Sequence, residues 1–291
     1  MNKHFIKQIY IEKIRHLKNI KIDLSDKEQK HLILTGINGS GKTALIETIK
    51  KYLEFIIEDI NKNGSYEIDI KFNLNDKNLL RSLYKQGKFI LGYYNSSRSI
   101  DFETPTGVQR VKLKNTYTFD ENPSKLFLKY LVDLKAQQSF ARNEEDMEVV
   151  ENIDNWFDKF ENAMRTILDD DSIKLKFDYR NYTFKILQDN REPYGFDELS
   201  DGYSSVLSIL CDLILRINKN RSIICRDYEF DTEGIVLIDN IEANLYVELQ
   251  NKILPFFVSF FPNIQFIVTT HSPFVLNSID NAIIYDLGKN D

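Results

Sequence analysis

Hydrophobic and polar positions alternate near the start of the chain, which predicts an opening antiparallel β segment. Apolar residues cluster at 9–11, and a second group at 20–24 alternates with charged residues. Residues 31–35 are apolar on both faces, as central strands of a parallel sheet are. From Thr43 onward the apolar spacing changes to three and four residues, which predicts a helix that ends near Asn63 and Gly64. The first sixty residues therefore predict strands followed by a strand–helix unit.

The rest of the chain predicts more α/β structure, interrupted by a stretch of a different kind. Residues 119–192 carry two helical patterns and a β-hairpin with its turn at Arg180 and Asn181. The other predicted elements are strands at 66–72, 88–94, 235–238, 264–269 and 283–285 and helices at 203–217 and 245–261. We interpret residues 119–192 as an insertion within a single domain that spans residues 1–291. The predicted fold class is α/β, with a central, mostly parallel sheet flanked by helices.

Composition and charge narrow the functional classes. The chain is 42% hydrophobic and 28% charged with only 11 Gly and 6 Pro, which indicates a folded globular protein. A net charge of −6 argues against constitutive binding to nucleic acid or anionic lipid, although a local basic groove stays possible. Cys211 and Cys225 have no neighbours at metal-binding spacing, and no apolar run is long enough for a signal peptide or a membrane span. We expect a cytoplasmic protein with no membrane partner.

One glycine-rich segment carries the most specific chemistry. Residues 36–43 read Gly-Ile-Asn-Gly-Ser-Gly-Lys-Thr, the G-x-x-x-x-G-K-[ST] pattern, between a buried strand and a helix. Glycines let successive backbone N–H groups surround a phosphate, and the helix N-terminus favours the anion. Lys42 is expected to reach phosphate oxygens and Thr43 to bind Mg²⁺. The predicted phosphate-binding residues are Asn38, Gly39, Ser40, Gly41, Lys42 and Thr43.

Three further motifs follow in a fixed order. Residues 199–203, Leu-Ser-Asp-Gly-Tyr, open a long apolar helix, and by themselves they are also compatible with an ordinary helix N-cap. An apolar strand at 234–238 ends in Asp239, the position from which a carboxylate orients Mg²⁺ in P-loop ATPases. A second apolar strand leads into residues 270–273, Thr-His-Ser-Pro.

Taken together, these motifs resemble the ABC-type ATPases, and within them the soluble SMC, RecF and OLD-like branch. That branch includes the ATPases of phage-defence systems such as Septu (the PtuA family) and retrons. Residues 36–43 match its Walker A motif, 199–203 its signature, 236–239 its Walker B motif and 270–273 its switch histidine. The resemblance implies ATP and Mg²⁺ as cofactors, with Thr43 and Asp239 at the metal.

The resemblance also implies a dimer and a set of catalytic residues. Such proteins pair head to tail, so that Ser200, Asp201 and Gly202 of one copy would contact the γ-phosphate held by the other copy. The catalytic residues that it implies are Asp239, Asn240, Glu242 and His271. We therefore expect a homodimer or a higher homo-oligomer.

One departure from the family pattern bears on the reaction rate. The family carries a glutamate after the Walker B aspartate, and Asn240 stands at that position here, while Glu242 matches a second acid. An amide orients water but takes no proton, and loss of a general base costs on the order of 10² to 10⁴ in rate. Slow hydrolysis is therefore expected, and from the sequence alone Asn240→Glu is expected to raise kcat.

The residue that couples the nucleotide to the rest of such a domain has two candidate positions. One is the segment from Asn95 to Arg98 after the strand at 88–94, and the other is Gln137 and Gln138 on a predicted helix. An exposed loop arginine is the more common role for Arg98. The sequence leaves the two positions open.

The leading hypothesis is an ATPase whose nucleotide-dependent dimer gates a separate effector protein, a nuclease or toxin, in prokaryotic anti-phage defence. The chain has no long heptad repeat and no further domain after His271, so the effector is expected to be another chain. Two alternatives remain, a RecF/SMC-like DNA-repair ATPase and an ATP-locked scaffold that hardly hydrolyses.

The predicted insertion carries most of the negative charge. Residues 142–171 contain eleven acids and three bases, with Trp156 and Phe157 among them. A solvated helix face explains such a run, and an acidic, aromatic docking surface for a partner is the alternative hypothesis.

Overall fold

The computed structural model divides the chain into two compact units. It describes residues 3–58, 67–74, 76–99, 101–218 and 230–289. Unit 1 comprises residues 1–97, 116–121 and 231–291, and unit 2 comprises residues 98–115 and 122–230. Unit 2 extends beyond both ends of the predicted insertion.

A five-stranded parallel sheet forms the centre of unit 1. Its strands lie in the order β11-β3-β10-β9-β5. Their bounds are β3 His31–Thr35, β5 Phe89–Tyr94, β9 Glu233–Ile238, β10 Ile264–Thr269 and β11 Ala282–Asp286. Because all five strands are parallel, the segments that follow them meet at one edge of the sheet. The expected α/β fold with a central parallel sheet is confirmed.

Helix α1, Lys42–Glu58, lies between this sheet and a second, antiparallel sheet. The second sheet has the order β2-β1-β4, with β1 Ile6–Ile14, β2 Leu17–Asp23 and β4 Ile68–Phe72. The inward-facing residues of both sheets and the apolar residues of α1 form one continuous core. Its fully buried members include Ile9, Ile11, Leu32, Leu34, Leu45, Ile46, Ile49, Ile70, Ile235, Leu237 and Ile267. The predicted changes in the spacing of apolar residues, from that of strands to that of a helix, thus correspond to the layers of unit 1.

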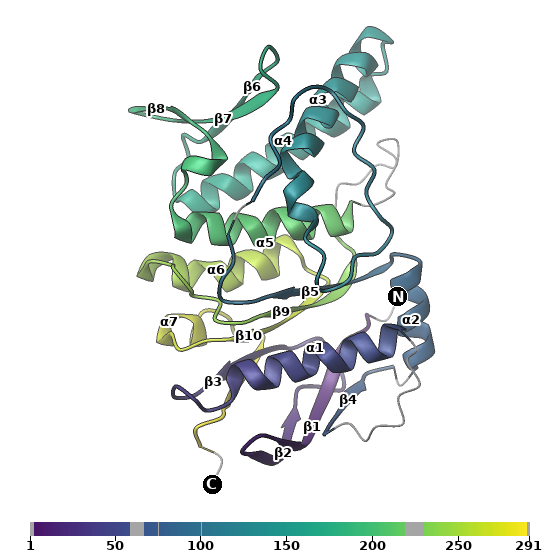
Figure 1. Cartoon of the computed structure of the whole chain (residues 1–291), viewed down its shortest axis with the longest axis vertical. Helices are drawn as coiled ribbons and strands as arrows, with labels where there is room; N and C mark the ends of the chain where they lie inside the picture. Colours follow the sequence, from purple (N-terminus) through teal and green to yellow (C-terminus); the bar gives the residue numbers. More distant parts are fainter. Residues whose placement is uncertain (1–2, 59–66, 75, 100, 219–229, 290–291) are drawn as a thin grey trace. The chain divides into compact units, whose positions relative to one another are not determined.

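Helix α6, Val247–Phe260, covers the opposite face of the parallel sheet from α1 (Figure 1). The ring of Phe257 on α6 stacks on Phe266 of β10, with centroids 5.9 Å apart. His31 of β3 lies on the same side, and its Nδ1 accepts a hydrogen bond from the backbone N–H of Phe266 at 3.0 Å. Alternate residues of each central strand therefore face α1 and α6, which explains why these strands are apolar throughout.

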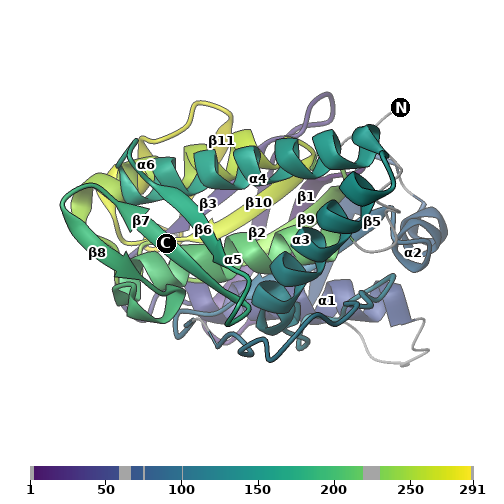
Figure 2. The same ribbon diagram turned by 90° about the horizontal axis from the view of Figure 1, so that it is seen from above.

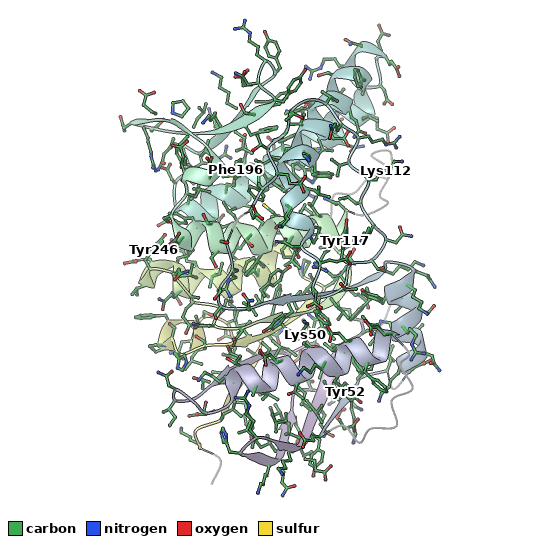
Figure 3. The ribbon with its side chains drawn as sticks, in the orientation of Figure 1. Lys50, Tyr52, Lys112, Tyr117, Phe196 and Tyr246 are labelled. Carbon is green, nitrogen blue, oxygen red and sulfur yellow. The ribbon has the colours of Figure 1, made fainter. Side chains whose placement is uncertain are left out.

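A short segment of unit 1, residues 116–121, packs on α1. Phe119 is buried in the α1 core, and Tyr117 accepts a hydrogen bond at its carbonyl from the Tyr84 hydroxyl at 2.9 Å. Lys50 of α1, labelled in Figure 3, forms an ion pair with Asp120 at 2.7 Å. Its Nζ lies over the rings of Tyr93 and Phe119. One basic side chain thus ties this segment to α1 and β5.

Unit 2 combines three long helices with a small antiparallel sheet. The helices are α3 Phe127–Asn143, α4 Met147–Leu168 and α5 Asp201–Ile217, and short 3₁₀ turns occupy Pro123–Leu126 and Phe196–Glu198. The sheet has the order β6-β7-β8, with bounds Lys174–Asp178, Thr183–Gln188 and Arg191–Tyr194 (Figure 2). The predicted hairpin is therefore two strands of a three-stranded sheet.

The aromatic residues of α4 belong to the core of unit 2. Trp156 is 1% exposed, and its ring packs against Phe127, Tyr130 and Phe160 at centroid distances of 5.6–6.4 Å. Phe157 is also buried. The aromatic part of the docking-surface hypothesis is therefore wrong, because the aromatic side chains of this helix face inward, while most of its acidic positions are exposed.

Among the described residues, two helices and one strand were not predicted, and two expectations lie outside this part of the chain. Helix α2, Lys77–Lys85, begins at Asp76, whose side chain accepts from the N–H groups of Asn78 and Leu79. The others are strand β8 and the short helix α7, Pro273–Leu276. The expected helix end at Asn63 and Gly64, and any role of Cys225, fall outside the described residues.

Candidate functional site

The glycine-rich loop connects the end of β3 to the start of α1. Gly36, Gly39 and Gly41 have φ values of 139°, 81° and 96°, which side-chain-bearing residues rarely adopt. A Cβ on Gly36 would lie 2.7 Å from Ser40 Oγ and 3.1 Å from the backbone nitrogen of Gly288. The loop therefore needs glycine for both its backbone conformation and its close packing.

Lys42 is buried at the base of the loop. Its Nζ donates to the carbonyl oxygens of Gly36 at 2.7 Å and Ile37 at 3.0 Å. Burial lowers the pKa of Lys42, and the carboxylates of Asp239, Glu242 and Asp286 oppose that shift. The Lys42 ammonium group is thus held inside the loop by two neutral carbonyl oxygens and by nearby carboxylates. A bound anion with several oxygens would form stronger, charge-assisted hydrogen bonds with it.

Three polar side chains converge where β3, β9 and β10 end. Thr43 Oγ1, at the start of α1, donates to Asp239 Oδ2 at 3.0 Å. Thr269 Oγ1, at the end of β10, donates to Asp239 Oδ1 at 2.6 Å and accepts from the backbone N–H of Asn240 at 2.7 Å. Asp239 is 5% exposed. The predicted loop threonine and strand-end aspartate therefore lie in direct contact.

The residues after Asp239 form a second cluster at the same sheet edge. The Glu242 carboxylate accepts from Thr270 Oγ1 at 2.7 Å and from the backbone N–H of His271 at 2.6 Å. Asn240 adopts a left-handed φ of 51°. His271 is exposed, whereas Thr270 and Ser272 on either side of it are buried. Of the sequence-predicted site residues, those at 38–43, 239, 240, 242 and 271 all belong to unit 1.

The other predicted motif, residues 200–202, belongs to unit 2. Ser200 is the N-cap residue of α5 with an extended backbone, and its carbonyl accepts the N–H of Ser204 at 2.9 Å. In the described structure the Ser200 side chain makes no capping hydrogen bond. Asp201 occupies the first turn and is exposed, and Gly202 is buried. Ser200 therefore lacks the side-chain bond of an ordinary N-cap serine, which was the alternative explanation of this motif.

The residues proposed to couple the nucleotide to the rest of the domain lie in both units. Asn95 directly follows β5, beside the end of β9, and the Asp239 N–H donates to the carbonyl of Tyr94 at 2.8 Å. Arg98 is only 9% exposed, and its Nε donates to Ser205 Oγ on α5 at 2.8 Å, so the expectation of an exposed loop arginine is wrong. Gln137 and Gln138 lie on α3 of unit 2, where they bond to Asp133 and Asp154. Of these candidates, Asn95 belongs to the same unit as Asp239 and follows a strand that pairs with β9.

The oxygen atoms of the cluster suit a hard divalent cation. Mg²⁺ takes oxygen ligands, often one or two protein side chains together with substrate phosphates. Thr43 and Asp239 already present a hydroxyl and a carboxylate to one another, next to a loop shaped for phosphate. These two residues would hold the ion.

Sequence reasoning missed Thr269 and Asp286. Thr269 donates to Asp239 Oδ1 at 2.6 Å, and its signal was a pair of threonines, Thr269 and Thr270, at the end of an apolar strand. Asp286 ends β11, and its charge acts on Lys42. The Leu287 N–H donates to the carbonyl of Thr35 at 2.9 Å, which places this turn beside the loop. A single carboxylate at the end of a short strand with a weak apolar pattern gave no recognisable sequence signal.

The fold and these contacts are typical of an AAA-type domain. A family model described as "AAA domain, putative AbiEii toxin, Type IV TA system" matches residues 32–277. The chain belongs to this family.

Two relatives and one solved structure illustrate the similarity. The Septu protein PtuA of Bacillus mycoides (strain KBAB4) is 26% identical over 100% of this chain and 42% of its own length. A retron Vc95 probable ATPase of Vibrio cholerae is 23% identical over 93% of this chain and 71% of its own length. The SMC head domain from Thermotoga maritima aligns over 97% of this chain and 94% of its own, with 13% identity and a TM-score of 0.46. The chain thus spans less than half of the PtuA relative.

Among the described residues, no helix combines the length and apolar character needed to span a membrane.

Proposed function

We propose that the chain binds ATP with Mg²⁺ in the glycine-rich loop and hydrolyses it slowly. The observation that carries this proposal is the contact of Thr43 and Thr269 with Asp239, next to the Lys42 loop. The backbone N–H groups of the loop and the N-terminus of the 17-residue helix α1 would bind phosphate oxygens. Lys42 would exchange its carbonyl partners for phosphate, while Thr43 and Asp239 hold the ion. When bound there, the cation would supply positive charge that offsets the charge on the transferring phosphate.

The side chains at the reacting end support slow turnover. Asn240 offers an amide where the family resemblance places a carboxylate base, so water can be oriented there but not deprotonated. His271 is exposed at the end of β10 and would contact the γ-phosphate, as the switch-histidine resemblance implies. We infer that ATP binding is better preserved than hydrolysis.

Nucleotide-dependent, head-to-tail dimerisation is the second part of the proposal. Several large apolar side chains are exposed near the phosphate loop and after the ends of β9 and β10, which supports a partner surface there. They are Ile37, Tyr246, Val247 and Phe274, of which Tyr246 is labelled in Figure 3. Ser200 and Gly202, at the N-terminus of α5, would contact the γ-phosphate bound by the other copy. ATP would then hold two copies together.

The third part of the proposal is that the dimer gates a separate effector, a nuclease or toxin, in anti-phage defence. Its support is the similarity to a Septu protein and a retron probable ATPase. Hydrolysis would reset the dimer, because its stability depends on the γ-phosphate. The alternative of an ATP-locked scaffold shares the binding step and differs only in turnover.

Binding and dimerisation are tested with Lys42→Ala, using Lys51→Ala as the matched control. Both lysines lie on α1, but Lys51 is exposed and outside the loop. With ATP and Mg²⁺, wild type and Lys51→Ala are expected to bind nucleotide and double in mass by light scattering, whereas Lys42→Ala does neither. Equal ATP affinity of the two variants would refute the proposed site. Single-turnover hydrolysis then separates a slow ATPase from a locked scaffold.

The effector proposal is tested by co-purification from the native operon in the presence of ATP. A partner retained by wild type and lost with Lys42→Ala supports nucleotide gating. Recovery of the bare protein in both preparations would contradict it.

A further inference from the structure

The Glu242 side chain connects two strand ends through hydrogen bonds. One carboxylate oxygen accepts the Thr270 hydroxyl at 2.7 Å, and the other accepts the His271 backbone N–H at 2.6 Å. Both donors belong to the segment that follows β10, whereas Glu242 follows β9. The exposed His271 therefore has its backbone tied to the neighbouring strand end through a single side chain.

Asn240 contacts the same carboxylate. With its amide nitrogen facing Glu242, Asn240 Nδ2 lies 2.9 Å from Oε1 and 3.2 Å from Oε2. The Asn240 backbone N–H is held by Thr269 Oγ1 at 2.7 Å. Its φ of 51° is a conformation that Asn and Asp tolerate better than most residues. Both the backbone and the side chain of residue 240 are thus fitted to this position.

The chemistry of the pair explains why an amide stands at position 240. An ionised carboxylate only accepts hydrogen bonds, and Asn is uncharged and has two N–H donors. A carboxylate at residue 240 would put two negative charges about 3 Å apart, and like charges at that distance disfavour each other strongly. The amide supplies a donor to Glu242 where a second acid would repel it.

We propose that Glu242 is a positioning residue that holds the switch-histidine segment, residues 270–273, and that Asn240 is its required donor partner. Because the lone pairs of Glu242 are engaged by Thr270, His271 and Asn240, it does not act as the base that replaces a glutamate at position 240. The catalytic consequence rests on the proposed ATPase function, since His271 would contact the γ-phosphate. A carboxylate at residue 240 alone is then expected to disturb the hydrogen bonds of Glu242, which replaces the sequence-based expectation that Asn240→Glu raises kcat.

An isosteric double-mutant cycle tests this pairing. Its members are wild type, Asn240→Asp, Glu242→Gln and the double variant, in which the acid and the amide exchange places. In the double variant the amide introduced at position 242 can donate to the carboxylate introduced at position 240, while the amide oxygen still accepts the His271 N–H. The first readout is hydrogen exchange of the His271 amide without nucleotide, with the Leu287 amide, bonded to the Thr35 carbonyl, as the internal control.

Asn240→Asp is expected to speed His271 exchange by about tenfold or more, which corresponds to roughly 1.4 kcal/mol, while Leu287 exchange stays constant. The double variant is expected to return to within about threefold of wild type. Unchanged His271 exchange in Asn240→Asp, or effects that simply add in the double variant, would overturn the pairing. Should Asn240→Asp not fold, Asn240→Ala removes the donor without adding charge, and its His271 amide is expected to exchange about threefold faster or more.

ATP affinity and hydrolysis of the same four proteins form the second readout. Hydrolysis is expected to fall by about tenfold in Asn240→Asp and to recover in the double variant, with ATP affinity nearly constant throughout. Failure of wild type to bind ATP would refute the proposed function and leave the exchange result standing. If wild type binds ATP normally but the effects of the two substitutions on His271 exchange simply add, the Asn240–Glu242 pairing is refuted and the proposed ATP binding is not.

Discussion

Thr43 Oγ1 lies 3.0 Å from Asp239 Oδ2, although the two residues are 196 positions apart in the sequence. One begins α1 and the other follows β9, and the parallel arrangement of β3, β10 and β9 brings these two ends to the same edge. A second hydroxyl, from Thr269, holds the other carboxylate oxygen at 2.6 Å. The cation-binding oxygens are therefore oriented by hydrogen bonds within the protein, which lowers the cost of ordering them when a ligand binds.

Thr43→Ala is expected to weaken ATP binding by about tenfold in the presence of Mg²⁺, because it removes one oxygen ligand and one partner of Asp239. Thr43→Ser keeps the hydroxyl and should bind nearly as wild type. Isothermal titration with ATP in Mg²⁺ and in EDTA measures both. Thr48→Ala is the control, since that hydroxyl bonds only within α1, to the Ala44 carbonyl. An equal loss in Mg²⁺ and EDTA would show that Thr43 does not act through the metal.

The sequence predicts the main layers of the fold because the layers leave strong periodic signals. The change from two-sided apolar residues at 31–35 to a helical spacing after Thr43 corresponds to β3 and α1, and residues 264–269 correspond to β10. Helix α2 was missed because it is nine residues long and mostly polar, so that its best signal is a single capping residue, Asp76. Burial of Trp156 could not be told from exposure, since an amphipathic helix does not reveal what covers its apolar face.

For the candidate site, motifs predict which residues take part but not how they are connected. The loop at 36–43 and Asp239 carry local patterns, and the resemblance adds Asn240, Glu242 and His271. The bond from Thr269 to Asp239 and those from Thr270 and His271 to Glu242 join separate strand ends. Such contacts depend on sheet order, which spacing along one chain does not encode. For this reason the sequence alone suggested that Asn240 replaces a catalytic base, whereas the structure shows that its side chain lies next to the Glu242 carboxylate.

Residues 116–121 offer a direct comparison of apolar burial with a surface ion pair. Phe119 is 5% exposed in the α1 core, so Phe119→Ala should lower the free energy of unfolding by about 3–5 kcal/mol. Asp120 pairs with Lys50 but its side chain is 81% exposed, so Asp120→Ala should cost less than about 1 kcal/mol. Urea denaturation measures both changes. Similar losses in the two variants would contradict the expectation that apolar burial of Phe119 stabilises this segment more than the surface ion pair does.

The buried ion pair of α5 should behave differently from the one on the surface. Arg216 Nε and Asp212 Oδ2 are 2.6 Å apart, and both side chains are 3% exposed. Asp212→Ala is expected to destabilise unit 2 by about 3–5 kcal/mol, because it leaves the guanidinium charge buried without this carboxylate. The double variant Asp212→Leu/Arg216→Met should be more stable than Asp212→Ala, since it removes both charges. Thermal unfolding of the two variants decides the matter, and a double variant that is less stable than Asp212→Ala would contradict this reasoning.

His31 should make stability depend on pH in the mildly acidic range. Burial, with a smaller contribution from Lys30, lowers the pKa of His31 to about 4 from its ordinary 6.5, and its Nδ1 accepts the Phe266 N–H as a neutral ring would. Between pH 4 and 6.5 the unfolded chain therefore binds more protons at this position than the folded chain, so stability rises with pH across that window. Acidification from pH 6.5 to 4 should lower the free energy of unfolding by up to about 3 kcal/mol.

His31→Asn retains an acceptor for the Phe266 N–H but does not titrate. Relative to that of wild type, its free energy of unfolding should thus rise, meaning greater relative stability, as the pH falls from 6.5 to 4, as measured by urea denaturation at several pH values. A difference between the two proteins that stays constant over this range would show that His31 does not titrate on unfolding, and that the acid sensitivity of the fold comes from its carboxylates.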